Sequence, residues 1–167
     1  MAKQRIQPEL RAERPYMPGY EMMFRTGAKK LSWTWAAKRL SEAHNYWLTT
    51  VASNGKPHVM PVWGVWFDRA FYFSTGPRSK KARNIETNNH CVVCPENAKA
   101  AVILEGEVRR ASPSDRSLRR VLMYYEKKYD WKMEGLDDSF YRIQPQKVFG
   151  ILEDGASNPA RWSFPRM

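Results

Sequence analysis

The chain has 167 residues and a formal net charge of +11, with 28 Lys or Arg against 17 Asp or Glu. That length fits one domain, and the two cysteines could form at most one disulfide. No apolar run reaches the ~20 residues of a membrane span, and the charged N-terminus lacks the apolar stretch of a signal peptide. We therefore expect a soluble, cytoplasmic protein with an anionic partner: nucleic acid, a membrane surface, or a phosphorylated or carboxylated small molecule.

Residues 1–31 carry seven Lys or Arg, three Glu, three prolines and two glycines. We predict that they form an extended N-terminal arm and that residues 32–167 form the folded domain. Ser32 is a plausible N-cap. The apolar residues after it recur at helical spacing: Trp33, Ala36, Ala37 and Leu40. This pattern predicts a helix over residues 33–44 with one buried stripe.

Segments rich in β-branched and aromatic residues follow the helix. Three of them, joined by short turns, cover 46–52, 57–68 and 71–75, and Asn54-Gly55 is a strong hairpin signal. Strand character returns at 90–95, at 100–111 and, in two pieces, at 140–144 and 147–153. Further helices are predicted over 80–89 and from Ser112 to about Asp130. Since no regular βαβ alternation is present, we predict a mainly β (α+β) fold, a six-stranded antiparallel barrel with flanking helices.

The segment TGPRSKKARN, residues 75–84, gathers four basic side chains at the start of a predicted helix. A helix N-terminus presents unpaired N–H groups and partial positive charge. Ser79 would add a cap and a hydroxyl donor, and Lys80, Lys81 and Arg83 would add cations. The result would be a cradle for an anion such as a phosphate. The alternative is a solvated basic helix face.

The strand HVMPVWGVWF carries a second signal. Pro61 cannot donate to a strand ladder and Gly64 has no side chain to pack, so both mark an interrupted or closely approached sheet. Trp63 and Trp66 are three residues apart and should point to opposite faces. We expect one of them in the core and the other along a groove. The alternative is a Trp-rich barrel core with an edge strand.

The remaining chemistry-bearing residues form no recognisable site. Cys91 and Cys94 match CxxC spacing, but residues three apart on a strand face opposite ways, so we interpret them as buried structural thiols. The three histidines, His44, His58 and His90, are scattered along the chain. The sequence therefore assigns no catalytic residue and no metal site.

The stretch HVMPVWGVWFD…FYFSTGPRSKKARNIETNNHCVV resembles the flavin- and deazaflavin-dependent split-barrel proteins, the superfamily of pyridoxamine-phosphate oxidase-like proteins. The resemblance runs from about Ser41 to Ile151, and the tail ARWSF extends it. It implies a split barrel and a homodimer with two cofactor sites at the interface. Ala160 stands where relatives often carry Thr. The motifs of true pyridoxamine-phosphate oxidases are not recognisable, so vitamin-phosphate oxidation is not the expected activity.

The resemblance also implies which residues bind the cofactor. These are Ser79, Lys80, Lys81 and Arg83 for the phosphate, Thr49, Thr50, Val51, Pro61, Val62 and Trp63 along the ring, and Arg161 and Trp162 from the other subunit. A Trp beyond the last predicted strand has little local core to enter. Trp162 would therefore either stay in water or dock elsewhere, and the resemblance implies that it docks beside the partner's cofactor.

These observations predict an oxidoreductase that moves hydride between F420 or FMN and a small organic substrate. The cofactor would carry the chemistry, which fits the lack of an acid–base set. The positive charge slightly favours F420, since its tail carries several carboxylates that the basic 1–31 arm could meet. Alternatives are a non-catalytic carrier of flavin, haem or a bilin, and, less favoured, a nucleic-acid-binding module. The expected partners are a second copy of the chain and the substrate, and no membrane.

Overall fold

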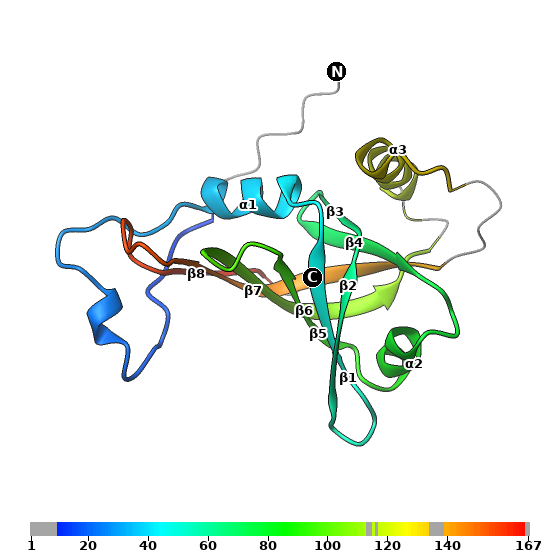
Figure 1. Cartoon of the computed structure of the whole chain (residues 1–167), viewed down its shortest axis with the longest axis horizontal. Helices are drawn as coiled ribbons and strands as arrows, with labels where there is room; N and C mark the ends of the chain where they lie inside the picture. Colours follow the sequence, from blue (N-terminus) through cyan, green and yellow to red (C-terminus); the bar gives the residue numbers. More distant parts are fainter. Residues whose placement is uncertain (1–9, 113–114, 116, 134–138, 166–167) are drawn as a thin grey trace.

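The computed structural model describes residues 10–112, 115, 117–133 and 139–165 (Figure 1). Its helices are α1 (Trp33–Glu42), α2 (Lys80–Thr87) and α3 (Leu118–Tyr129), with a short 3-10 helix, η1, at Glu21–Met23. Its strands are β1 (Tyr46–Val51), β2 (Pro57–Val62), β3 (Gly64–Phe67), β4 (Ala70–Thr75), β5 (His90–Pro95), β6 (Ala100–Arg110), β7 (Ser139–Leu152) and β8 (Ala160–Ser163). They form one antiparallel sheet in the order β2-β1-β5-β6-β7-β4-β3, and β8 pairs with β7. No described helix has the length and apolarity needed to span a membrane.

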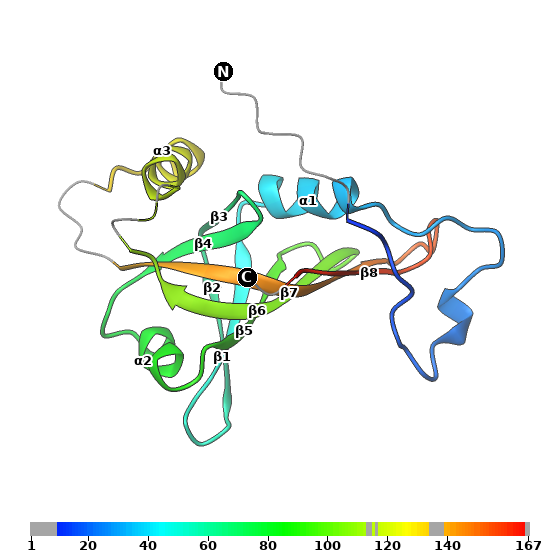
Figure 2. The ribbon, with the colours of Figure 1, turned by 180° about the vertical axis from the view of Figure 1, so that it is seen from behind.

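The sheet curls because one stretch of chain supplies both of its edges. β2 and β3 are separated only by Trp63, yet they lie at opposite ends of the strand order. The chain therefore passes from one edge of the sheet to the other at Trp63, and the sheet forms a half-barrel with helices at its flanks (Figures 1 and 2). Gly64 is required at this bend, since a Cβ there would overlap the Phe71 ring. The predicted mainly β split-barrel fold is confirmed.

The predicted count of six strands is wrong, because the described residues form eight. The segment 57–68 divides at Trp63, and the C-terminal segment adds β8. The two pieces predicted at 140–144 and 147–153 are joined without a break in β7, which runs through Pro145. A register shift between Glu105 and Gly106, opposite Pro145, accommodates a residue that has no N–H to donate.

Side-chain caps fix where α1 and α2 begin. The Ser32 hydroxyl accepts the Trp35 amide at 3.2 Å, and the Ser79 hydroxyl accepts the Ala82 amide at 3.1 Å. Both N-caps are those that the sequence predicts. The buried stripe of α1 is also as predicted, with Ala37 partly buried beside it: Trp33, Ala36 and Leu40.

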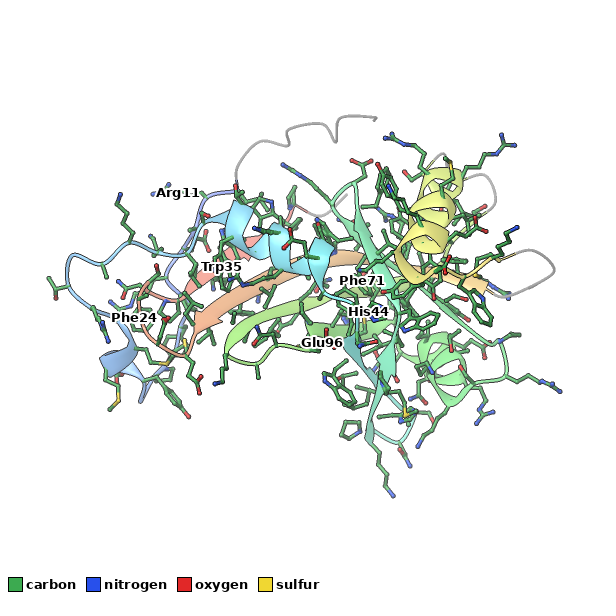
Figure 3. All side chains as sticks on the ribbon, turned by 45° about the horizontal axis from the view of Figure 1, so that its top comes forward. Arg11, Phe24, Trp35, His44, Phe71 and Glu96 are labelled. Carbon is green, nitrogen blue, oxygen red and sulfur yellow. The ribbon has the colours of Figure 1, made fainter. Side chains whose placement is uncertain are left out.

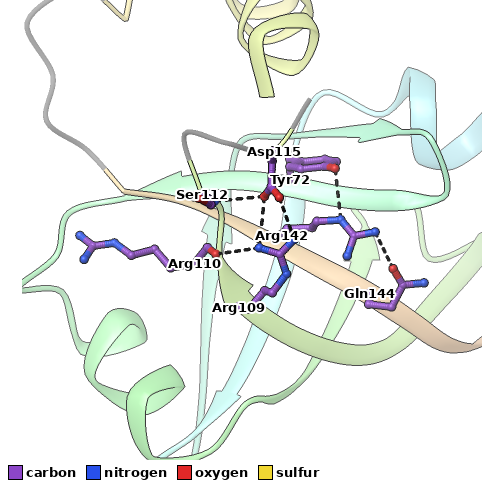
Figure 4. Close-up of polar contacts among 7 residues, drawn as sticks. All are labelled: Tyr72, Arg109, Arg110, Ser112, Asp115, Arg142 and Gln144. Carbon is purple, nitrogen blue, oxygen red and sulfur yellow. Dashed lines mark hydrogen bonds and ion pairs between the residues drawn. The ribbon is translucent and has the colours of Figure 1, made fainter. Parts of the chain in front are cut away.

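α3 begins at Leu118, later than the predicted start in 112–115, of which 113–114 lie outside the described residues. A carboxylate-centred turn occupies this stretch. Asp115 accepts two bonds from Arg109, at 3.1 and 3.2 Å, and one from the Ser112 amide at 3.0 Å (Figure 4). The Arg109 bonds hold the pKa of Asp115 below its ordinary value. Asp130, in the left-handed region with φ of 48°, ends the helix.

The apolar residues form two clusters on either side of the sheet. The larger cluster fills the barrel and includes Phe71 and Trp162. The smaller cluster packs α3 onto β3 and β4 through Val65, Val121 and Tyr125. α3 therefore covers a part of the sheet that the barrel core does not reach.

The described part of the N-terminal arm packs along β8. The backbones of Glu13 and Arg161 exchange two hydrogen bonds, of 2.8 and 3.0 Å, and the Arg161 guanidinium binds the Glu13 carboxylate. Farther along, the Asn158 side chain accepts the Arg25 amide at 2.7 Å. In Figure 1, η1 lies at the opposite end of the molecule from α2. The described part of the arm is therefore remote from the basic start of α2 in the same chain.

Candidate cofactor site

A cavity of about 430 Å³ opens beside the bend between β2 and β3. The bend, β4, α2 and α3 all contribute to its walls. Its lining residues are Asn45, Pro61, Val62, Trp63, Ser74, Lys81 and Tyr125. Four of the residues predicted from the sequence are thus brought together: Pro61, Val62 and Trp63 from the bend, and Lys81 from α2.

Trp63 is an exposed wall of this cavity, whereas Trp66 belongs to the core. Trp63 keeps 38% of its surface exposed and Trp66 keeps 6%. The Trp63 ring stacks on the Tyr129 ring, with centroids 4.6 Å apart and an angle of 7° between the planes. The predicted division of the two Trp between groove and core is confirmed. One face of the Trp63 indole is covered by Tyr129, and part of the ring remains open.

Among the predicted phosphate-binding cations, Lys81 lines the cavity and the other two lie at the surface. Burial lowers the pKa of Lys81, because partial removal from water disfavours the charged form. Lys80 is exposed, and the exposed Arg83 donates to the Arg78 carbonyl at 2.9 Å. An anion bound beside Lys81 would compensate for the water that this ammonium has lost.

Ser79 fixes the orientation of the first turn of α2. Its hydroxyl oxygen accepts the Ala82 amide, and the hydroxyl of Thr75, at the end of β4, lies 3.1 Å from it. The Ser79 amide in turn donates to the Gly76 carbonyl at 2.9 Å. The turn between β4 and α2 is therefore bonded internally. The remaining N–H groups of the first turn have no intrahelical partner.

The ionisable groups near α2 make this part of the molecule positive. Burial, followed by the charges of Lys80 and Lys81, lowers the pKa of His58 on β2. The field at this end of the molecule therefore favours an anionic ligand.

Thr50 anchors α2 to the sheet and does not line the cavity. Its Oγ1 accepts a hydrogen bond of 3.0 Å from Asn84 Nδ2, and the two residues are 0% and 5% exposed. Thr49 and Val51 are partly buried and alternate with Thr50 along β1. The register pairs Tyr46 with Val62, so residues 49–51 lie farther along β1 than the cavity wall. Within one chain, the structure does not bring these three predicted residues to the cavity.

The expectation that Trp162 has no local core to enter was wrong. β8 extends the sheet beside β7, and Trp162 is fully buried with its ring 5.6 Å from that of Trp33. Its indole Nε1 is the one buried side-chain polar atom without a partner in the described part of the chain. Arg161 is bound to Glu13. Neither of these predicted residues lines the cavity of its own chain.

Four residues that shape the site were not predicted as site residues from the sequence. Asn45, Ser74 and Tyr125 line the cavity, and Asn84 holds α2 in place. Asn45 precedes β1 and donates to a Glu96 carboxylate oxygen at 2.9 Å. Asn84 is buried in α2 together with Ala82 and Ile85, which helical spacing alone did not indicate.

The cysteines carry no sign of reactivity. Cys91 is buried, Cys94 is partly buried, and both are free thiols. Burial raises the pKa of Cys91 to about 12 and that of Cys94 to about 11, so neither is a thiolate near neutral pH. Among the residues that the structure describes, no group of three or more His, Cys, Asp or Glu could hold a metal ion.

The family model described as pyridoxamine 5'-phosphate oxidase matches residues 35–151. Similar solved structures include an F420 reductase, at 20% identity over 66% of this chain and 93% of that chain with a TM-score of 0.55. An FAD-binding protein from Mesorhizobium loti is 21% identical over 80% and 96% of the two chains, with a TM-score of 0.59. HutZ, the heme storage protein from Vibrio cholerae, is 17% identical over 68% and 89%, with a TM-score of 0.58. Identities at this level show a shared fold, and no curated protein matches the chain.

Proposed function

Since this chain belongs to the pyridoxamine 5'-phosphate oxidase family, we propose that it is an oxidoreductase that transfers hydride between F420 or FMN and a small organic substrate. The observation that carries this proposal is the convergence of Pro61, Val62, Trp63 and Lys81 on one cavity beside the capped start of α2. At about 430 Å³, the cavity is in the size range of small-molecule sites.

We assign the phosphate of the cofactor to the start of α2. Lys81 is the partly desolvated cation at the cavity, and the N–H groups of the first helical turn add donors and partial positive charge. Lys80 and Arg83 stand at the surface nearby, where they attract an anion before it binds. Each charge-assisted hydrogen bond to the phosphate would contribute roughly 1.5–3 kcal/mol.

We assign the ring of the cofactor to the bend. Pro61 and Val62 offer apolar edges, and the open part of the Trp63 indole offers a flat surface for a conjugated ring. Such aromatic contacts contribute ~0.5–1.5 kcal/mol beyond apolar burial. The cofactor, when bound, supplies the hydride chemistry. The residues of the chain bind it, orient it and keep water away from its ring.

A second copy of the chain would cover the exposed side of this site. Trp47 on β1 and Val59 on β2 remain 49% and 48% exposed. Trp47 pairs with Pro61 across the two strands, so it shares a face with a cavity residue. Exposed apolar faces of this kind mark interfaces. Sedimentation at micromolar concentration should give a dimer, and Trp47→Lys should give a monomer.

Separate titrations with FMN and with F420 test the cofactor assignment. We expect saturable binding of at least one of them at one molecule per chain, and turnover when a reductant and an acceptor are supplied. The net charge of +11 favours F420. Because η1 and the rest of the described arm lie far from α2 in the same chain, residues 10–31 that met the F420 tail would have to come from the partner. Failure to bind either cofactor overturns the proposal.

A second candidate, a haem carrier, is favoured by His44. Its ring is exposed and lies 6.2 Å from the ring of the cavity residue Trp63. HutZ, which shares the fold, is a heme storage protein. With haem added, a Soret band of the wild-type chain that shifts in His44→Ala would favour the carrier over the oxidoreductase, provided that no turnover is seen with FMN or F420.

A further inference from the structure

The bend between β2 and β3 is held by two consecutive residues of α3. Gly64 begins β3 at an edge of the sheet, and its N–H donates to Tyr129 Oη at 2.7 Å. Its carbonyl oxygen lies 3.0 Å from Lys128 Nζ and 2.9 Å from Tyr129 Oη. Both polar groups of the Gly64 backbone are therefore satisfied by the last turn of α3, on the side where no further strand pairs.

Lys128 links this bend to two other parts of the chain. Besides the Gly64 carbonyl, its ammonium donates to Tyr46 Oη at 2.9 Å and to the Ser41 carbonyl at 3.4 Å. The three donors of the ammonium thus reach the end of α1, the start of β1 and the start of β3. One side chain ties together the elements that meet at the bend.

Tyr129 connects the same helical turn to the cavity. Its ring covers one face of the Trp63 indole at 4.6 Å, nearly parallel to it, and the His44 ring contacts it edge-on at 5.1 Å. Its hydroxyl oxygen accepts a hydrogen bond from the Gly64 N–H. Its single O–H can donate either to the Gly64 carbonyl or to the His44 carbonyl, which lies 2.8 Å away. Tyr125, one turn earlier on α3, lines the cavity itself. The end of α3 is therefore continuous with the wall of the cavity.

We propose that Lys128 and Tyr129 are positioning residues that hold Trp63 in place as the wall of the cofactor cavity. Neither residue lines the cavity, and each acts through Gly64 or Trp63. Without them, Gly64 would keep only its pairing with Phe73 across β3 and β4, and the Trp63 ring would lose its parallel partner. The effect on ligand affinity rests on the proposed function, whereas the effect on the Trp63 ring does not.

The test uses the full chain labelled with 5-fluorotryptophan, with Trp63→Phe to identify the Trp63 resonance. We compare Tyr129→Leu, which removes both the ring contact and the hydroxyl, with Tyr129→Phe, which keeps the ring. Lys128→Met removes the ammonium. Tyr124→Leu is the matched control, because Tyr124 lies on the same helix but packs against Phe67, with centroids 5.4 Å apart.

We expect Tyr129→Leu to move the Trp63 fluorine resonance towards its position in the unfolded chain, and Tyr129→Phe and Lys128→Met to move it less. FMN affinity should fall about threefold to tenfold in Tyr129→Leu, from the loss of an aromatic contact of ~0.5–1.5 kcal/mol. In a Trp63→Ala background, Tyr129→Leu should cause no further loss of FMN affinity. A purely structural role for Tyr129 would still lower affinity in that background.

The proposal is overturned if the Trp63 resonance stays in place in both Tyr129 variants, or if Tyr124→Leu lowers FMN affinity as much as Tyr129→Leu does. If Tyr129→Leu does not fold, the comparison of Tyr129→Phe and Lys128→Met with the control decides the matter. A wild-type chain that binds neither FMN nor F420 would refute the proposed function, while the fluorine spectra would still test the positioning.

Discussion

The start of α2 and the strand β8 were predicted to be two sides of one cofactor site. They differ in whether their predicted binding residues already have partners within the chain. At α2, Lys81 faces a cavity, and no ion pair among the described residues includes it. At β8, Arg161 is paired with Glu13 and Trp162 is buried in the core. A partly desolvated cation without an acidic partner indicates a ligand, whereas the same residue type with a partner inside the chain stabilises the fold.

The largest effect that separates the two regions should come from Trp162→Ala. Trp162 is fully buried against Trp33, so its removal should cost ~3–5 kcal/mol of the free energy of unfolding. Trp63→Ala, at an exposed position, should cost much less stability but should weaken cofactor binding. Urea unfolding of both variants provides the comparison. An unchanged unfolding midpoint for Trp162→Ala would mean that β8 is not part of the core.

Lys81→Ala should lower FMN or F420 affinity roughly 10- to 100-fold, the equivalent of ~1.5–3 kcal/mol for one charge-assisted bond. Arg83→Ala is the matched control on the same helix, since its guanidinium is exposed and bound to the Arg78 carbonyl. Fluorescence titration measures both affinities. Equal losses for the two variants would indicate a diffuse basic surface rather than a defined phosphate site.

The bond between Asn84 and Thr50 should matter for holding α2 on the sheet. Thr50→Val alone leaves the buried Asn84 amide without its partner and should cost ~1–3 kcal/mol of the free energy of unfolding. Adding Asn84→Leu, which removes both polar groups, should recover part of that loss. A double variant that is less stable than the sum of the single variants would contradict a simple buried pair.

The smallest expected effect concerns the pH dependence of stability at Lys128, which holds the bend beside the cavity. Burial lowers the pKa of Lys128 from 10.5 to about 8, and the carboxylate of Glu96 partly opposes this shift. Tyr46 and Tyr129 also face the ammonium, with pKa values raised by burial, and the Asn45 amide joins Glu96 to His44 nearby (Figure 3).

Between about pH 8 and 10.5 the folded chain therefore binds fewer protons at Lys128 than the unfolded chain does, so its stability should rise with pH in this window. Thermal unfolding at pH 7.5 and pH 9.5 should show the gain in the wild type relative to Lys128→Met. Parallel pH dependence in the two proteins would contradict it.

The parts of the structure that could be predicted from the sequence depend on neighbours along the chain. The Ser32 and Ser79 caps and the buried stripe of α1 need only local spacing, and each is present. Pro61 and Gly64 indicated an interruption within residues 57–68, and the strand does divide at Trp63. That the chain crosses there to the opposite edge of the sheet could not be predicted, because the crossing requires α3 and the curl of the whole sheet.

The C-terminal segment and the cavity also depend on residues that are distant in the sequence, so they could not be predicted from local patterns. No packing partner for Trp162 could be inferred from the sequence, because α1, which packs against it through Trp33, lies more than a hundred residues earlier in the chain. Ser74 and Tyr125 join the cavity only through the packing of β4 and α3. Local chemistry could indicate the turn that we propose to bind phosphate, but only the tertiary fold shows that Lys81, and not Arg83, lines the cavity.

The most direct test of the α2 assignment compares FMN with riboflavin, which has the same ring but no phosphate. If the phosphate binds at the start of α2, FMN should bind the wild-type chain at least roughly 10-fold more tightly, as expected for one or more charge-assisted bonds. In Lys81→Ala the difference should shrink, with riboflavin affinity nearly unchanged. Equal affinities of the wild type for FMN and riboflavin would contradict the account.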